Sequence, residues 1–156
     1  MATNGIARFG AYGGSCNITQ LIDIPHTNLI FRARFQVVQW STFNSGEPGG
    51  YAAVGISFLD STEKSMATSL YYLNPHGPSQ SRRGMHWIRL KPSKPLPTRW
   101  FDVVCDLRQE LKYHQIRPDL VSKIVIMGII FGTHEDKVAS IGKFASFSLQ
   151  TTQEQN

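Results

Sequence analysis

Apolar and polar residues alternate with a period of two along much of this chain, and helical periodicity is almost absent. Between residues 29 and 37 one parity carries the apolar side chains: Leu29, Phe31, Ala33, Phe35 and Val37. The other parity carries polar ones: Arg32, Arg34 and Gln36. This alternation is typical of a β-strand with one buried face, because successive side chains of a strand point to opposite sides of the sheet.

Eight runs of strand length follow one another, separated by breaks rich in Gly, Pro, Asn and Asp. The predicted strands are Cys16 to Ile24, Leu29 to Trp40, Tyr51 to Asp60, Met66 to Leu73, Met85 to Leu90, Trp100 to Leu107, Lys123 to Phe131 and Phe144 to Leu149. One short helix is expected at Arg108 to His114, ahead of Pro118. Strands at this spacing predict an all-β fold, an antiparallel two-sheet β-sandwich of jelly-roll type.

The length of 156 residues fits one domain with a core of its own, so we expect a single domain over residues 1–156 with a polar tail from Thr151. The apolar run from Ile124 to Ile130 is far shorter than the roughly 20 residues that a membrane helix needs. The first residues lack the order of a secretory signal. The sequence therefore leaves two expectations for location, a cytoplasmic protein or a domain excised from an extracellular one.

The two cysteines, Cys16 and Cys105, both lie on the apolar parity of predicted strands. We expect two buried free thiols, because unpaired cysteine behaves as a small hydrophobic residue. A single bridge remains open if the two strands are neighbours. No metal site is expected, since there is no Cys-x-x-Cys pair and the five histidines are isolated in sequence: His26, His76, His86, His114 and His134.

The sequence contains few features that suggest catalysis. The chain has no Gly-x-Ser-x-Gly motif and no Gly-rich phosphate loop that opens a helix. Asp102 and Asp106 share one face of a predicted strand, but they stand too far apart along it to flank a single glycosidic bond. We therefore expect no enzymatic activity.

Positive charge is concentrated between Gln80 and Trp100. This stretch holds six of the sixteen basic residues and no acidic one, so it accounts for the net charge of +5. One interpretation is an electropositive loop that attracts a polyanion, with Arg82, Arg83, Lys91 and Lys94 as its binding residues. The other is a solvated loop kept extended by its prolines. No motif for specific nucleic-acid binding accompanies the charge.

Three stretches resemble the jelly-roll carbohydrate-binding modules of the galactose-binding-domain-like type. They are Tyr51-Ala-Ala-Val-Gly-Ile-Ser-Phe-Leu-Asp60, Trp100-Phe-Asp-Val-Val-Cys-Asp-Leu-Arg108 and Ile141-Gly-Lys-Phe-Ala-Ser-Phe-Ser-Leu149, and the resemblance covers most of residues 16–150. Such modules often bind a structural calcium through an Asp in the last strand. Here that strand reads Phe144-Ala-Ser-Phe-Ser-Leu149, so the resemblance implies a possible calcium but the acidic ligand is missing.

The resemblance implies noncatalytic binding of an oligo- or polysaccharide by aromatic stacking platforms and planar polar side chains. The residues that fit these roles are Arg34, Gln36, Trp40, Tyr51, Tyr72, Asn74, Trp87 and Arg89. The basic segment adds a preference for acidic polysaccharides. Trp100 and Phe101 are expected in the core.

A structural or adaptor module is the alternative function. Residues 124–131 are apolar on both parities, so a strand there needs cover on both faces. Ile124, Ile126 and Ile130 are expected to face the core. The opposite parity then needs another cover: Val125, Met127, Ile129 and Phe131. Candidates are residues 6–12, the helix at 108–114, or a second protein, which leaves a homo-oligomer open.

Overall fold

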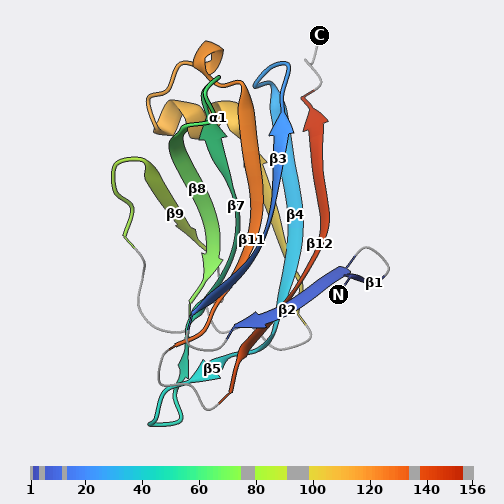
Figure 1. Cartoon of the computed structure of the whole chain (residues 1–156), viewed down its shortest axis with the longest axis vertical. Helices are drawn as coiled ribbons and strands as arrows, with labels where there is room; N and C mark the ends of the chain where they lie inside the picture. The colour runs from blue at the N-terminus through green and yellow to red at the C-terminus, as the bar shows by residue number, and fades with distance from the viewer. Residues whose placement is uncertain are drawn as a thin grey trace.

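The chain forms a sandwich of two five-stranded sheets (Figure 1). The computed structural model describes residues 2–3, 6–11, 14–74, 80–90, 99–133 and 138–152. Sheet A has the order β1 (Ala2–Thr3), β2 (Ile6–Ala11), β12 (Ser140–Thr151), β4 (Leu29–Gln39) and β10 (Phe101–Asp106). Sheet B has the order β3 (Ser15–Asp23), β11 (Lys123–Phe131), β7 (Tyr51–Leu59), β8 (Ser65–Leu73) and β9 (Met85–Arg89).

The predicted β-sandwich is confirmed, and each of the eight predicted runs is a strand. Three details differ. The β8–β9 pair is parallel rather than antiparallel. Strand β12 begins at Ser140, before the predicted start at Phe144, and β2 was not predicted as a strand. A small ribbon of β5 (Ser41–Thr42) and β6 (Pro48–Gly49) precedes β7.

Aromatic rings from sheet A fill the centre of the sandwich, as the alternation of β4 requires. The Phe35 ring is fully buried and stacks on Phe144, with centroids 5.8 Å apart. Phe101 lies against the other side of Phe35, at 6.0 Å. The inner face of sheet B meets these rings with aliphatic side chains: Val54, Ile56, Ile124, Ile126 and Ile130. Phe101 is therefore a core residue, as predicted.

The predicted helix is α1 (Leu107–Tyr113), which begins where the alternation of β10 stops. Asp106 caps it by accepting a hydrogen bond from the backbone nitrogen of Arg108, at 3.0 Å. Leu107 and Leu111, one turn apart, are fully buried and fix the helix against the core. A 3₁₀ turn, η1 (Pro118–Leu120), leads from α1 to β11. The helix lies at the end of the sandwich, close to the start of β9 (Figure 1).

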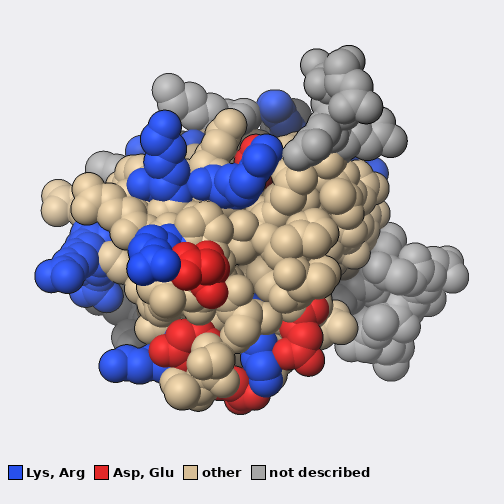
Figure 2. All heavy atoms as spheres, turned by 90° about the horizontal axis from the view of Figure 1, so that it is seen from above, with Lys and Arg blue, Asp and Glu red and all other residues tan. Residues whose placement is uncertain are grey.

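This end of the molecule carries both signs of charge. Figure 2 views it from above and shows Lys and Arg side chains gathered along one side, with Asp and Glu side chains among them. The end is therefore not a uniformly positive surface. Any anion site here must be formed locally by basic groups without carboxylate partners.

The cysteines are free, and they lie in different sheets. Cys16 is in β3 of sheet B and is half-buried, whereas Cys105 is in β10 of sheet A and is buried. The expectation of two free thiols is confirmed, with Cys16 less buried than expected. Burial raises the pKa of the Cys105 thiol to about 12, although a hydrogen bond with Tyr71 acts in the opposite direction.

We expect the two thiols to react with a thiol reagent at different rates. The thiolate is the reactive form, and Cys105 is both buried and held protonated at pH 8. At that pH, Cys16 of the native protein should react quickly with the reagent, and Cys105 should react only on unfolding. A Cys16→Ser variant should lose the fast phase. Fast labelling of Cys105 in native Cys16→Ser protein would show that the burial of this thiol is wrong.

Candidate functional site

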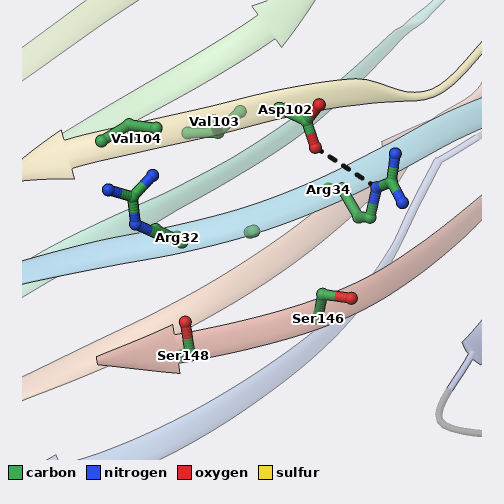
Figure 3. Close-up of a pocket in the computed structure, with 8 residues that line it drawn as sticks. Arg32, Arg34, Asp102, Val103, Val104, Ser146 and Ser148 are labelled. Carbon is green, nitrogen blue, oxygen red and sulfur yellow. Dashed lines mark ion pairs between the residues drawn. The ribbon is translucent and has the colours of Figure 1, made fainter. Parts of the chain in front are cut away.

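A groove on the outer face of sheet A brings polar side chains of three strands together (Figure 3). Because Phe31, Ala33 and Phe35 of β4 point into the core, Arg32 and Arg34 between them point outward. On the neighbouring strand β10, Asp102 stands directly opposite Arg34, and Val104 stands opposite Arg32.

Arg34 is held in place by two neighbours. Its Nε lies 3.2 Å from Oδ1 of Asp102, and its guanidinium carbon lies 5.4 Å from the centre of the Trp100 ring. The Arg34 and Asp102 side chains remain 44% and 73% exposed. An exposed ion pair of this kind contributes at most about 1 kcal/mol to stability. Its main consequence is to fix a planar donor and a carboxylate side by side at the surface.

The third wall of the groove depends on a β-bulge in β12. Ala145 pairs with Arg34 and Ser148 pairs with Arg32, so one extra residue is inserted between these two pairs. Ser146 adopts a positive φ of 57° at the bulge. The insertion changes the parity of the strand, so that Phe144 and Phe147 both pack against the core while Ser146 and Ser148 line the groove.

The groove has a volume of about 460 Å³. It is lined by Arg32, Ala33, Arg34, Asp102, Val103, Val104, Ser146 and Ser148. Figure 3 shows Arg34 and Asp102 at one end, with Arg32, Val104 and Ser148 at the other. Arg32 makes no ion pair within the described part of the chain, so two guanidinium groups face one carboxylate.

The groove has the chemistry of a binding site. The guanidinium groups only donate hydrogen bonds, the carboxylate only accepts them, and the serine hydroxyls can do both. Glycoside hydrolysis normally requires two carboxyl groups that flank the bond. Among the described residues that line the groove, Asp102 is the single carboxylate. The groove therefore places hydrogen-bond donors and acceptors side by side around one carboxylate.

We expect Ser146→Gly to be tolerated and Ser146→Val to be destabilising. A positive φ costs an L-residue about 1–2 kcal/mol, which glycine avoids, and a β-branched side chain is the least suited to it. Chemical denaturation of both variants measures this difference. Equal stability of the two would contradict the bulge geometry.

Gln36 in β4 and Trp40 just after it were also predicted as ligand-binding residues, but they do not line the groove. Gln36 is buried on the parity of Arg34 and is closed off from solvent. Trp40 packs against the core, and its buried Nε1 has no hydrogen-bond partner among the described residues. Of the predicted sheet A residues, Arg34 alone lies in the groove.

The remaining predicted residues are brought together on the outer face of sheet B, the opposite side of the sandwich. Tyr51 stacks on Phe131 at 5.2 Å and meets the edge of Trp87 at 5.8 Å. Tyr72, which is 1% exposed, meets Trp87 at 5.4 Å. Arg89 donates from Nη2 to the carbonyl of Asn74, at 3.3 Å. The rings use much of their surface on one another and form a second small hydrophobic cluster.

The two parities of β11 separate as predicted. Ile124, Ile126 and Ile130 face the core, and the opposite parity is half-buried: Val125, Met127, Ile129 and Phe131. Strand β2 belongs to sheet A, and α1 contacts the inner side of β8, so neither segment is a layer over the outer face of sheet B. Half-burial favours neither a glycan module nor an assembly module.

The described arginines of the basic segment lie in three different places. Arg82 and Arg83 precede β9 and line a second cavity with the end of α1, whereas Arg89 lies at the other end of β9. Arg99 lies over the Phe101 ring, 5.0 Å from its centre. Lys91 and Lys94, like His76, lie outside the described residues.

Several site residues escaped sequence reasoning. Trp100 was expected in the core, and this was wrong: it is half-buried beside the outward-pointing Arg34, on the parity of Asp102. Arg32 and Asp102 are on the outward parity of their strands, which was a usable signal. Ser146 and Ser148 depend on the bulge, for which the spacing of Phe144 and Phe147 gives the only hint.

The implied calcium does not fit this strand. At the bulge the chain offers Ala145 and Ser146, and calcium requires six to eight oxygen ligands, several of them charged. Among the described residues, no three His, Cys, Asp or Glu side chains converge as a metal site.

In the same part of the chain, no helix is long and apolar enough to cross a bilayer.

The chain matches no family model and no curated protein sequence. Among solved structures, a loop-swap mutant of Necallimastix patriciarum Xyn11A is similar over 97% of this chain and 85% of its own, with a TM-score of 0.51 and 6% identity. The shared feature is the jelly-roll sandwich. At this identity the likeness shows the fold alone.

Two further structures are more distant in shape. The module TmCBM61, in complex with β-1,4-galactotriose, aligns over 93% of this chain and 69% of its own, with a TM-score of 0.47 and 12% identity. The xyloglucanase domain of NopAA from Sinorhizobium fredii, in complex with cellobiose, aligns over 87% of this chain and 75% of its own, with a TM-score of 0.49 and 12% identity. The function of the present chain must be argued from its own groove.

Proposed function

We propose that this chain is a noncatalytic glycan-binding module whose site is the groove on the outer face of sheet A. The observation that carries the proposal is the grouping of Arg34, Asp102 and Trp100 beside a hollow lined by two serine hydroxyls. Arg34 and Asp102 are placed by the register of β4 and β10, and Trp100 directly precedes β10. The Arg34–Asp102 pair is therefore held on two paired strands before a ligand arrives.

The chemistry of sugars matches this grouping. A sugar ring presents neighbouring hydroxyl groups that both donate and accept, and planar Arg and Asp side chains can bond two such hydroxyls at once. Its less polar face packs on an aromatic ring such as Trp100. The groove lies on an open sheet face, which leaves room for a glycan chain to extend past it.

The charge of the groove supports a preference for acidic glycans. Arg32 and Arg34 stand against Asp102 alone, and Arg32 has no acidic partner in the described part of the chain. Arginine binds carboxylate and sulfate groups through paired N–H donors. We expect a uronic acid or sulfated sugar to place its anionic group at Arg32.

Affinity electrophoresis through gels that contain neutral or acidic polysaccharides tests the proposal. The protein should be retarded by at least one polysaccharide, and retardation by an acidic one should persist at 0.15 M salt. General attraction to polyanions would vanish at that salt, because exposed charges are then screened beyond about 8 Å. An absence of retardation in every gel would overturn the proposed function.

A further inference from the structure

A second cavity lies at the end of the sandwich, where the turn before β9 meets the end of α1. This edge pocket has a volume of about 490 Å³ and is lined by Ser81, Arg82, Arg83, Gly84, Tyr113, His114 and Gln115. The turn is fixed by two backbone hydrogen bonds between Arg82 and Met85, of 2.8 and 3.0 Å. Gly84 supplies the positive φ, 77°, that the turn requires. The backbone that carries both arginines is therefore ordered.

The pocket is positively charged and lacks a carboxylate on its described lining. Arg82 and Arg83 form no ion pair within the described part of the chain, unlike Arg34 and Arg117, which pair with Asp102 and Asp119. Two guanidinium groups next to each other repel unless an anion lies between them. Their planar forks match the geometry of a carboxylate, sulfate or phosphate group.

A buried hydrogen-bond chain holds His114 against this pocket. Ser69, which is fully buried, donates from Oγ to Oε2 of Glu110 at 2.6 Å. The same Ser69 oxygen lies 2.9 Å from Nε2 of His114. Because the single hydroxyl proton goes to Glu110, Ser69 accepts from His114, so the proton of the neutral imidazole is on Nε2. Nδ1 is then an acceptor, with no partner in the described part of the chain.

Other groups that face His114 determine its charge. Burial lowers the pKa of His114, the Glu110 carboxylate opposes this, and His86 adds to the lowering. His86 in turn contacts Oε2 of Glu110 through Nδ1, at 2.7 Å, and stacks on Tyr113 at 3.6 Å. An anion bound between Arg82 and Arg83, which line the same pocket as His114, would favour its protonation and make Nδ1 a donor.

We propose that the edge pocket binds an oxyanion between Arg82 and Arg83, and that protonation of His114 strengthens this binding. The site is separate from the groove on sheet A, which lies on the outer face formed by β4, β10 and β12. It does not depend on the proposed function. Binding is linked to proton uptake, so a bound anion raises the proton affinity of His114 by the same factor by which protonation raises the affinity for the anion.

Inorganic sulfate is the first probe, because its charge does not change between pH 5.5 and pH 8. Its binding is followed by NMR titration at constant ionic strength, with chloride as the balancing anion. We expect sulfate to bind about tenfold more tightly at pH 5.5 than at pH 8, since an opposite charge within about 4–6 Å shifts a pKa by one unit or more. The histidine side-chain signals should identify His114 as the group that takes up the proton.

Substitutions distinguish sulfate binding in the edge pocket from binding at other arginines of the chain. The Arg82→Ala, Arg83→Ala double variant should lose sulfate binding, and Arg82→Lys, Arg83→Lys should weaken it while keeping the charge. His114→Gln should retain the affinity seen at pH 8 but show no increase at pH 5.5. Arg34→Ala and Arg117→Ala should bind as the wild type does. Unchanged binding by the double alanine variant, or equal affinity at both pH values, would overturn the proposal.

Phosphate and glucuronate, tested at pH 5.5 in the same way, distinguish the source of the oxyanion. Tighter binding of glucuronate than of sulfate would indicate a uronic acid, and the reverse order would indicate a sulfate or phosphate ester. Failure of all three anions to perturb the pocket signals would overturn the proposal. Such a result would leave the proposed function of the groove unaffected, because that function is tested separately with polysaccharides and the Arg34 variant.

The ligand-free protein should also show the effect of His114 on stability. Its folded-state pKa lies below the usual 6.5, so the unfolded chain binds the proton more readily. The free energy of unfolding should therefore fall as the pH drops below about 6.5. The difference between wild type and His114→Gln in melting temperature, followed from pH 7.5 to 5, isolates this contribution. A parallel pH dependence in the two proteins would contradict it.

Discussion

Replacement of Arg34 by alanine is expected to weaken glycan binding about 10- to 100-fold. Hydrogen bonds to a charged group contribute about 1.5–3 kcal/mol, and the variant also leaves Asp102 without its partner. For an acidic glycan the freed carboxylate adds repulsion, so the loss should be larger than for a neutral one. Calorimetric titration with a glycan selected by affinity electrophoresis measures the change.

Arg117→Ala is the matched control for Arg34→Ala. Arg117 also pairs with a neighbouring aspartate, at 2.7 Å from Asp119, and is exposed, but it lies outside the groove. It should bind glycan as the wild type does. Both variants should keep nearly full stability, because exposed ion pairs contribute little to it. If Arg117→Ala reduced binding as much as Arg34→Ala, the effect would reflect overall charge and the groove would not be the site.

Replacement of Phe35 by alanine is expected to lower the free energy of unfolding by about 3–5 kcal/mol. The ring is fully buried between Phe144 and Phe101, so its removal leaves a cavity at the centre of the sandwich. A domain of this size has about 5–15 kcal/mol of stability in total. Urea denaturation followed by tryptophan fluorescence measures the loss.

Leu21→Ala is the comparison for the core variant. Leu21 lies on the edge strand β3 and is 48% exposed, so its truncation should cost less than about 1 kcal/mol. A Phe35→Ala variant no less stable than Leu21→Ala would show that sheet A does not pack on sheet B through this ring.

The period of two was sufficient to predict the sandwich. In β4 it identified both the core face and the outward Arg32 and Arg34, because a strand with one buried face leaves no choice of parity. It was not sufficient for β2, where Ile6–Ala11 has no clear alternation of apolar and polar residues. It also could not give the parallel pairing of β8 and β9, since strand direction depends on the path of the connecting chain.

The site was less accessible from sequence than the fold. Arg34 was predicted, but its partner Asp102 stands 68 positions further along the chain, and only the register of β4 and β10 brings the two together. Strict alternation from Phe144 would place Ser146 and Ser148 on the core side, and the bulge at Ser146 places them on the groove wall instead. Two of the aromatic residues predicted to stack on sugar, Tyr51 and Trp87, pack on each other and on their neighbours instead.

The groove and the edge pocket differ in chemistry. The groove has mixed donors and acceptors on an open sheet face, whereas the edge pocket has paired arginines and a histidine held by buried groups. An acidic glycan offers both hydroxyl and oxyanion groups. The glycan-binding test of the groove and the anion-binding test of the edge pocket would together show which cavity recognises hydroxyl groups and which recognises oxyanions.

The most direct test of the proposed function is NMR mapping of the surface that an oligosaccharide contacts. Backbone amide signals of the labelled protein are compared with and without a fragment of the retained polysaccharide. We predict that the perturbed signals cluster on the three groove strands, at residues 32–34, 102–104 and 146–148. Perturbations confined to the outer face of sheet B, around Tyr51 and Trp87, would contradict the groove as the binding site.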